Sequence, residues 1–546
     1  MFDPPDRVPF ASIPYGVNDS PEHRALALET ARKSMVLLKN EGGLLPLDPT
    51  LGTIAVIGPN ADDEEVLLGN YNGFPADPVT PLRGIREKVA PGTRIVYARG
   101  TELAENLSFL ERIPASALRT QPGGGGAHGL RAEYYANADL EGVPFAIRTD
   151  ETLDFRWWGD APMANLRPGE FSVRWTGALL PPVSGRYSLG GKGLGRFRVW
   201  VNDSLVAQFG SEHEINTRWT DFELEAGHPQ QIRVEFRPRR SDGAVQLVWA
   251  RPEPDLRADA LRAAESADAV VMFLGLSPHL EGEEMRVEVP GFAGGDRVDI
   301  GLPAPQLELL DAVVEKGKPV VLVLLSGSAL AIPWAAEHVP SIVEAWYPGQ
   351  AAGTAIADVL FGDYNPGGRL PVTFYRSTDQ LPPFSDYDMD GRTYRYFRGD
   401  PLFPFGHGLS YTTFAYRNLS LPSSVRAGED VRVAVEVENA GRVAGEEVVQ
   451  LYLTDLESSA PVPLRSLQGV RRIFLEPGER QTLSFTLSPR QLSLMDSAWE
   501  RVLEPGVFEV SVGGKQPGFT GWADAASTSV RSGRFEVVGR PLRLER

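Results

Sequence analysis

The sequence predicts an α/β domain that is interrupted by an inserted β-sandwich and followed by a second β-sandwich. Apolar runs of strand length alternate with helical segments in two separate parts of the chain, which is typical of one parallel α/β layer. Between those parts, and again after them, short alternating strands are separated by Gly, Pro and Asp turns. The expected boundaries are 21–120 and 255–376 for the two parts of the α/β domain, 121–254 for the inserted module, 418–546 for the C-terminal sandwich, and 1–20 and 377–417 for linkers.

Composition narrows the class of protein. The chain has 546 residues, of which 42% are hydrophobic and 23% are charged, as in ordinary globular domains. Its formal net charge of −18 argues against a nucleic-acid partner, which requires a basic footprint. The absence of Cys excludes disulfides and thiolate zinc sites. No apolar run approaches the roughly 18 residues of a transmembrane helix, so no membrane partner is expected. The Pro-rich N-terminus also lacks the apolar core of a secretory signal.

The first part of the α/β domain follows an extended segment. Three prolines in the first nine residues disfavour a helix over residues 1–20. A helix is expected from Pro21 to Lys39, capped by Asp19 or Ser20, because apolar residues recur there at helical spacing. The segments that follow are TIAVIGPNA as a buried strand, TPLRGIREKV as a helix and RIVYARG as a strand.

The inserted module begins, on this interpretation, after a flexible QPGGGGAHG linker. Its short strands contain many aromatic residues, and four tryptophans are candidates for stacking on sugar rings. They are Trp157, Trp158, Trp175 and Trp219. Such side chains are more often part of a core. Trp158 is retained as a candidate substrate-binding residue.

The second part of the α/β domain holds the candidate site. Val270 to Leu274 is expected to be a buried parallel strand, and the loop after it carries Glu281, Glu283 and Glu284. Carboxylates on a loop at the end of such a strand suit general acid chemistry, although an acidic, solvated surface loop is the alternative. The loop closes through glycines into Asp296 and Arg297, and LPAPQLELLDAVVEKGKP then predicts a helix. The remaining segments are PVVLVLLSG as a buried strand and AAGTAIADVLFG as a helix.

The C-terminal region, from Asn418 to Gly539, alternates cleanly between apolar and polar residues. This pattern predicts a seven-strand sandwich. No catalytic constellation occurs in it, so a packing and stability role is expected.

The candidate loop also carries a family resemblance. The string GLSPHLEGE, followed by GGDR and LPxxQ, resembles the acid/base loop of glycoside hydrolase family 3, the β-glucosidases and β-xylosidases. Counted from the Gly that ends the strand, the residue that matches the family's acid/base is Glu281, and Glu283 is the second candidate. The resemblance implies that Asp296 and Arg297 position the loop or contact substrate, and a helix-start role is the alternative.

Other motifs extend the resemblance over nearly the whole chain. SMVLLKNEGGLLPL, IAVIGPNA, NPGGRLPVTF and FPFGHGLSYTTF are similar to the family's C-terminal α/β domain. The inserted module resembles a protective-antigen-type β-sandwich, without the Asp pair that holds calcium in lectin members. The C-terminal sandwich resembles the family's fibronectin type III-like domain.

The family's nucleophile has no counterpart in the sequence. In the family it is an Asp on an N-terminal (β/α)₈ barrel, whereas Ser-Asp occurs here only at Ser241-Asp242 and Ser385-Asp386, neither of which follows a barrel strand. The sequence starts where the family's barrel ends, so residues 1–20 are interpreted as the linker from an absent barrel. The chain is therefore expected to be a fragment or truncated product, a subunit of a split enzyme, or a protein that works alone.

The resemblance implies a retaining, exo-acting β-glycosidase that needs no metal or organic cofactor. Glu281 would protonate the leaving oxygen, and Glu283 and Glu284 are expected to favour its protonated form by like-charge proximity. The expected partners are a β-linked oligosaccharide or glycoside and either a (β/α)₈ barrel chain or another copy of this chain. Two alternatives are a non-catalytic carbohydrate-binding or scaffold protein and, disfavoured by its missing phosphate loop, a nucleotide-binding protein. Family members are often periplasmic or secreted, which is the localisation the resemblance favours.

Overall fold

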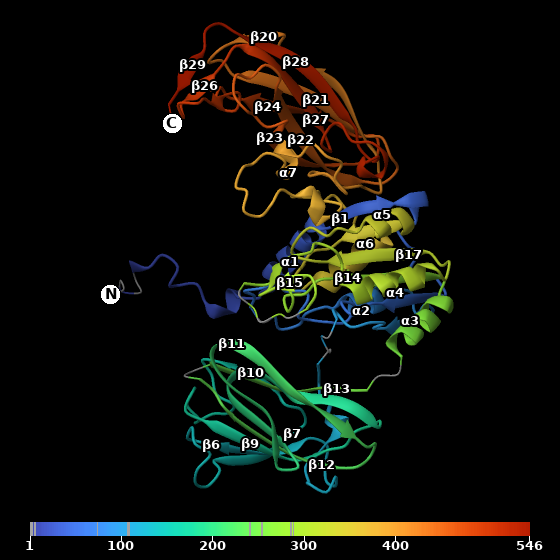
Figure 1. The fold of residues 1–546 in the computed structure, drawn as a ribbon, viewed down its shortest axis with the longest axis vertical. Helices are drawn as coiled ribbons and strands as arrows, with labels where there is room; N and C mark the ends of the chain where they lie inside the picture. The colour runs from blue at the N-terminus through green and yellow to red at the C-terminus, as the bar shows by residue number, and fades with distance from the viewer. Residues whose placement is uncertain are drawn as a thin grey trace. The chain divides into compact units, whose positions relative to one another are not determined.

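The computed structural model of the protein divides the chain into two compact units, which are residues 1–106 with 256–546, and residues 107–255. The residues it describes are 4, 7–73, 75–105, 107, 110–239, 242–252, 255–283, 285, 287 and 289–545, with the side chains of 211–215 left out. The first unit contains an α/β domain and a C-terminal β-sandwich, and the second unit is all β (Figure 1). The predicted fold class is confirmed.

The α/β domain is built on a six-stranded sheet. Its strand order is β1-β18-β17-β14-β2-β3, in which β1 is antiparallel to β18 and every other neighbouring pair is parallel. The strands are β1 Val36–Asn40, β2 Thr53–Ile57, β3 Arg94–Ala98, β14 Ala269–Gly275, β17 Val320–Leu325 and β18 Ser341–Glu344. All residues of β14 and β17 are buried, as expected for central strands covered on both faces.

Helices cover both faces of this sheet (Figure 1). One core lies between the sheet and α3, α4 and α5, and the other between the sheet and α1, α2 and α6. Alternate residues of β14 point into the two cores, Met272 into the first and Phe273 into the second. The helices are α1 Pro21–Ser34, α2 Pro81–Lys88, α3 Leu256–Glu265, α4 Ala304–Val314, α5 Pro333–His338 and α6 Ala352–Phe361.

The predicted first helix is too long. Helix α1 ends at Ser34, Met35 is already extended, and Val36–Asn40 forms the edge strand β1. Three consecutive apolar residues, Val36 to Leu38, are buried together in this strand. A continuous apolar run of this kind suits a strand covered on both faces, and its helical spacing was coincidental. Ser20, one of the two predicted caps, accepts the N–H of His23.

The β unit contains a ten-stranded antiparallel arrangement with the central order β4-β13-β10-β12-β9-β6-β7. Its strands are β4 Glu111–Arg112, β5 Leu118–Arg119, β6 Leu130–Tyr135, β7 Ala146–Asp150, β8 Asp154–Trp158, β9 Ser172–Leu179, β10 Gly185–Val201, β11 Ser204–Leu224, β12 Gln230–Arg237 and β13 Asp242–Ala250. The predicted flexible linker at 121–129 is instead a hydrogen-bonded turn between β5 and β6, closed by the N–H of Thr120 donating to the carbonyl of Ala127 at 3.0 Å.

The tryptophans of the β unit fall into two groups. Trp157 and Trp175 belong to its core, where they pack against Phe155. Trp158 and Trp219 are 42% and 41% exposed. The core role therefore applies to two of the four stacking candidates.

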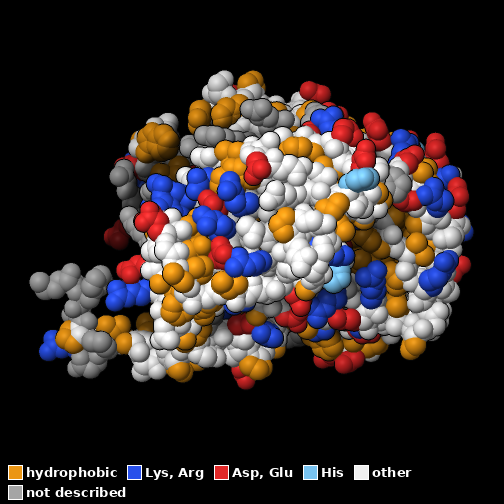
Figure 2. Space-filling model, turned by 90° about the horizontal axis from the view of Figure 1, so that it is seen from below, with side chains coloured by type: hydrophobic (Ala, Val, Ile, Leu, Met, Phe, Trp, Pro, Cys, Tyr) orange, Lys and Arg blue, Asp and Glu red, His pale blue; other side chains and the backbone are white. Residues whose placement is uncertain are grey.

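On the face shown in Figure 2, basic and acidic side chains are interspersed, which does not resemble a nucleic-acid footprint.

The C-terminal sandwich has eight strands in two facing sheets, rather than the predicted seven, among the residues described. One sheet has the order β19-β21-β24, the other β20-β28-β27-β22-β23, and a small third sheet is formed by β25, β26 and β29. The strands are β19 Phe414–Ser420, β20 Ser424–Arg426, β21 Val431–Asn439, β22 Gly445–Asp455, β23 Ser466–Leu475, β24 Arg480–Leu487, β25 Leu494–Met495, β26 Arg501–Leu503, β27 Gly506–Gly513, β28 Val530–Val538 and β29 Leu542–Leu544.

The sandwich and the α/β domain are joined by a buried ion pair. Arg369 donates to the Glu447 carboxylate at 2.6 Å, and the side chains of Tyr416 and Thr528 donate to the other oxygen of Glu447. The segment at 377–417, predicted to be a linker, contains the short helix α7 Thr393–Tyr396, and its last residues pack on β1. There, the buried His407 bonds to the carbonyl of Leu38 at 2.9 Å.

Candidate active site at the carboxyl edge of the α/β sheet

Four neighbouring parallel strands bring the candidate residues together. Strands β18, β17, β14 and β2 lie side by side, so their carboxyl ends meet at one edge of the sheet. The loop after β14 carries Glu281, the loop after β17 carries Gly327 and Ser328, and the turn after β18 carries Tyr347. This is the edge at which α/β proteins place their ligands.

Glu281 is held by three hydrogen bonds from these loops. Its Oε1 accepts the Gly327 N–H at 2.7 Å and the Tyr347 hydroxyl at 2.5 Å, and its Oε2 accepts the Ser328 hydroxyl at 2.8 Å. A Cβ at Gly327 would lie 3.0 Å from Glu281 Oε1 and 3.0 Å from the Tyr347 ring, so a larger residue there would force one of these side chains to shift. Both oxygens of Glu281 therefore face protein donors.

Arg297 is hydrogen-bonded to the same network through Ser328. Its Nη1 donates to the Ser328 hydroxyl at 2.9 Å and to the Ala329 carbonyl at 2.7 Å, and its Nη2 reaches the Gly301 carbonyl at 3.1 Å. Burial lowers the pKa of Arg297, and the charge of Glu281 opposes this effect. One guanidinium thus fixes the loop that carries two of the three donors to Glu281.

A second, fully buried carboxyl group lies close to this network. Glu344 Oε1 accepts the Trp346 N–H at 3.0 Å and the Ser326 hydroxyl at 3.3 Å. Burial raises the pKa of Glu344 well above its ordinary value, and the charge of Glu281 adds to this. Trp346 has a φ of +61°, a strained conformation for a bulky residue, and this turn aims the next side chain, Tyr347, at Glu281.

Tyr347 remains a hydrogen-bond donor. Burial first, and then the charge of Glu281, raise the pKa of the Tyr347 hydroxyl above its ordinary range. A phenol in this state keeps its proton at any physiological pH. The contact between Tyr347 and Glu281 is therefore a stable structural feature of the site.

Glu283 lies in a different environment. It is exposed, and its only hydrogen bond among the described residues comes from the hydroxyl of Tyr71, which is itself 87% exposed. The contact with Glu283 raises the pKa of Tyr71. Glu284 is outside the described residues. The acidic neighbour that acts electrostatically with Glu281 is Glu344, which no motif in the sequence indicates.

The loop backbone is anchored at two further points. The Asn70 side chain donates to the Glu281 carbonyl at 2.5 Å, and Gly282 donates to the Gly295 carbonyl at 3.2 Å. Asp296 and Arg297 form β16 (Asp296–Arg297), which pairs with β15 (Phe292–Ala293). The helix-start alternative for these two residues is wrong, because α4 begins only at Ala304. Asp296 is exposed at the hairpin.

The structure therefore brings some predicted residues together and separates others. Glu281 and Arg297 meet through Ser328, Glu283 shares their loop but bonds to Tyr71, and Trp158 belongs to the other unit. Gly327, Ser328, Glu344 and Tyr347 were missed. Their positions in the sequence could have indicated them, since each of these residues ends or follows a buried parallel strand. The described residues contain no cluster of three or more His, Cys, Asp or Glu that could hold a metal ion.

Comparison with known proteins identifies the family. Residues 35–411 match the glycosyl hydrolase family 3 C-terminal domain, and residues 447–516 match a fibronectin type III-like domain. The chain therefore belongs to glycoside hydrolase family 3, as the loop motif indicated. Over the described residues, no helix is long and apolar enough to cross a membrane.

The relatives of this chain are named either as β-xylosidases or as β-glucosidases. It is 36% identical over 522 residues to a xylan 1,4-β-xylosidase of Xylanibacter ruminicola, covering 94% of this chain and 59% of the relative. It is 30% identical over 531 residues to a β-glucosidase of Rhizobium radiobacter, covering 91% and 60%. The crystal structure of a β-glucosidase from Kluyveromyces marxianus superposes with a TM-score of 0.74 at 27% identity, covering 96% of this chain and 64% of that one. The chain thus spans less than two thirds of the length of these relatives.

Proposed function

We propose that this chain supplies the acid/base loop of a retaining β-glycosidase of the glucosidase or xylosidase type. The nucleophile would come from a (β/α)₈ barrel, on another polypeptide or on a longer form of this one. Another copy of this chain brings only the same residues, so we favour a barrel as the partner. The substrate class is a β-linked oligosaccharide or glycoside. The main support for this function is the structure of the loop after β14. Three hydrogen bonds to Glu281 hold this loop in place, and Glu283 on the same loop remains exposed.

Within this loop we rank Glu283 ahead of Glu281 as the proton donor, which reverses the order taken from the sequence. A general acid needs a carboxyl oxygen that can reach the glycosidic oxygen. Both oxygens of Glu281 are occupied by the protein, whereas Glu283 is exposed and bonds only to the exposed Tyr71 within the part of the chain described. Glu281 would then be a positioning residue that holds the loop.

The chemistry follows the two-step route of retaining enzymes. The barrel carboxylate attacks the anomeric carbon while Glu283 gives its proton to the departing glycosidic oxygen. The Glu283 carboxylate then takes a proton from water as that water attacks the glycosyl–enzyme ester. The nucleophile is released, the anomeric configuration is retained, and Glu283 regains its proton. No redox or metal-dependent step is required by this sequence of events.

The test combines the 546-residue chain with a separately produced family barrel and measures hydrolysis of β-glucosides and β-xylosides. Glu283→Gln should abolish hydrolysis of alkyl glycosides, whose leaving groups need protonation. It should spare the first step with dinitrophenyl glycosides, whose leaving groups need no protonation, so that the glycosyl–enzyme accumulates. Added azide, which needs no general base, should then release it as a glycosyl azide. Glu281→Gln, as the matched control, should reduce both substrate classes alike and show no azide product.

If these two patterns are exchanged, Glu281 is the donor and the sequence-based ranking stands. If no barrel restores hydrolysis under any condition, a catalytic role for this chain fails. A loss of the fold in either variant is detected by circular dichroism before the activities are compared.

A carbohydrate-binding function of the β unit is the second candidate. It is favoured by the exposure of Trp158 and Trp219, which differs from the core burial of Trp157 and Trp175. Large aromatic faces stack well on sugar rings. Titration of the full chain with neutral xylo- and gluco-oligosaccharides would test it, and binding that Trp158→Ala leaves unchanged would exclude this residue from such a site.

A further inference from the structure

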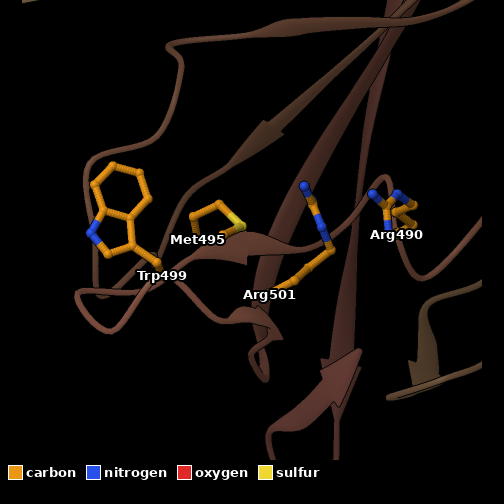
Figure 3. Close-up of a pocket in the computed structure, with 4 residues that line it drawn as sticks. All are labelled: Arg490, Met495, Trp499 and Arg501. Carbon is orange, nitrogen blue, oxygen red and sulfur yellow. The ribbon is translucent and has the colours of Figure 1, made fainter. Parts of the chain in front are cut away.

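A pocket on the C-terminal sandwich lies outside the proposed active site. It has a volume of about 360 Å³ and is lined by Arg490, Met495, Trp499 and Arg501. Figure 3 shows these side chains in a row, with Trp499 and Met495 at one end and the two arginines at the other. The pocket therefore joins an apolar surface to a cationic one, at a size that suits one or two sugar rings.

The aromatic end is presented by a tight turn. The carboxylate of Asp496 accepts the N–H groups of Ala498 and Glu500, both at 2.9 Å, and Trp499 at the tip is 74% exposed. The φ of Trp499 is +59°, a conformation in which glycine or asparagine is more stable than a bulky residue. The turn alone thus gives no reason for a tryptophan, and strained backbone of this kind is often found at binding sites.

The cationic end is not neutralised within the described residues. Arg490 donates to the carbonyl of Glu545 at 3.2 Å and Arg501 to the hydroxyl of Ser493 at 3.1 Å, so both use only part of their donors on neutral acceptors. The neighbouring Glu500 is paired instead with Arg543 at 2.6 Å. Two guanidinium groups therefore face this pocket in a chain whose net charge is −18.

We infer that this pocket binds an acidic glycan, with a uronic acid carboxylate on the two arginines and a sugar face on Trp499. Guanidinium groups pair with carboxylates through two parallel hydrogen bonds, and the C–H face of a pyranose packs on an aromatic ring. Two guanidinium groups provide enough hydrogen-bond donors for both oxygens of one carboxylate. They are too few for nucleic acid, which requires a broad basic surface. The inference does not depend on the proposed catalytic function.

A matched pair of ligands isolates the carboxylate. The full chain is titrated calorimetrically with a glucuronic-acid-bearing xylo-oligosaccharide and with the same oligosaccharide after its carboxylate has been reduced to an alcohol. We expect the acidic form to bind at least about tenfold more tightly, since hydrogen bonds between charged groups are stronger than neutral ones. An oligomer of galacturonic acid should also bind, because the carboxylate rather than the backbone sugar is recognised.

Variants locate the site and separate binding from folding. Arg490→Ala and Arg501→Ala should each weaken binding of the acidic ligand about tenfold. Trp499→Gly should also weaken it while leaving the melting temperature equal or higher, because glycine relieves the positive φ. Arg432→Ala and Phe474→Ala change exposed residues of the same sandwich outside this pocket, and should leave binding unchanged.

Equal affinity for the acidic and reduced ligands would overturn the inference, as would binding that survives all three pocket variants. Tighter binding of a single-stranded oligonucleotide than of the uronic ligand, lost in the same variants, would assign the pocket to a different class of partner. The outcome is independent of hydrolysis by the candidate active site, because no turnover is measured.

Discussion

The hydroxyl of Tyr347 donates to Oε1 of Glu281 at 2.5 Å, although the two residues are 66 positions apart in the sequence. The contact joins the turn after β18 to the loop after β14, across the end of β17. Because Oε1 also accepts the N–H of Gly327, one carboxylate oxygen ties together loops from three adjacent strands. Glu281 is thus placed to order the edge of the sheet.

Tyr347→Phe should loosen this edge without unfolding the domain. The variant removes one charge-assisted hydrogen bond, so we expect a loss of about 1.5 kcal/mol in the free energy of unfolding. Backbone amides between 276 and 283 should exchange hydrogen faster. Urea titration and hydrogen exchange measure these effects. Tyr71→Phe removes an exposed hydroxyl and serves as the control, and an equal loss in both variants would contradict this role of Tyr347.

Glu344→Gln should change the pH dependence of stability. The folded-state pKa of Glu344 lies well above the ordinary value of 4.5, so above pH 4.5 the unfolded chain loses a proton that the folded chain keeps. The free energy of unfolding should therefore fall by about 1.4 kcal/mol per pH unit from this residue as pH rises from 4.5 toward the folded pKa. Glu344→Gln should remove that slope, whereas the exposed control Glu308→Gln should retain it.

His407 should change the free energy of unfolding with pH in the opposite direction to Glu344. Complete burial lowers the pKa of His407 from 6.5 to about 4, so between pH 6.5 and 4 the unfolded chain binds a proton that the folded chain does not. Stability should fall as pH drops through this window, by about 3 kcal/mol in total. His407→Gln should flatten this part of the curve of unfolding free energy against pH. His228→Gln, on the exposed surface of the β unit, should not, and an unchanged curve for His407→Gln would refute the assignment.

Arg369→Met should separate the sandwich from the α/β domain. The substitution leaves the fully buried Glu447 without its cation, at a cost of about 3–5 kcal/mol. We expect a lower melting temperature and faster proteolysis between 411 and 420. Arg480→Ala breaks an ion pair with Glu438 in which the arginine is 55% exposed, and should cost less than about 1 kcal/mol. Similar costs for the two variants would contradict the importance of burial.

Local sequence patterns predicted correctly the helices and strands whose structure depends mainly on their own residues. The continuous apolar run at Val270 to Leu274 predicted a buried parallel strand, and TPLRGIREKV predicted the helix that forms from Pro81 to Lys88. The helix predicted as far as Lys39 ends at Ser34, because an apolar run such as Val36 to Leu38 has no unique period and suits a strand as well as a helix. The glycine-rich segment at 121–129 is a hydrogen-bonded turn and not the predicted flexible linker, because glycine content does not reveal which backbone groups pair.

By itself, the sequence determined the fold class, the family, and the loop on which the acidic residues lie, because these depend on local periodicity and short motifs. Only the tertiary structure decided the environments of Glu281 and Glu283. Neighbours along the chain do not set which carboxylate meets a protein donor. That depends on Gly327, Ser328 and Tyr347, which sheet order alone brings to Glu281 from two other strands.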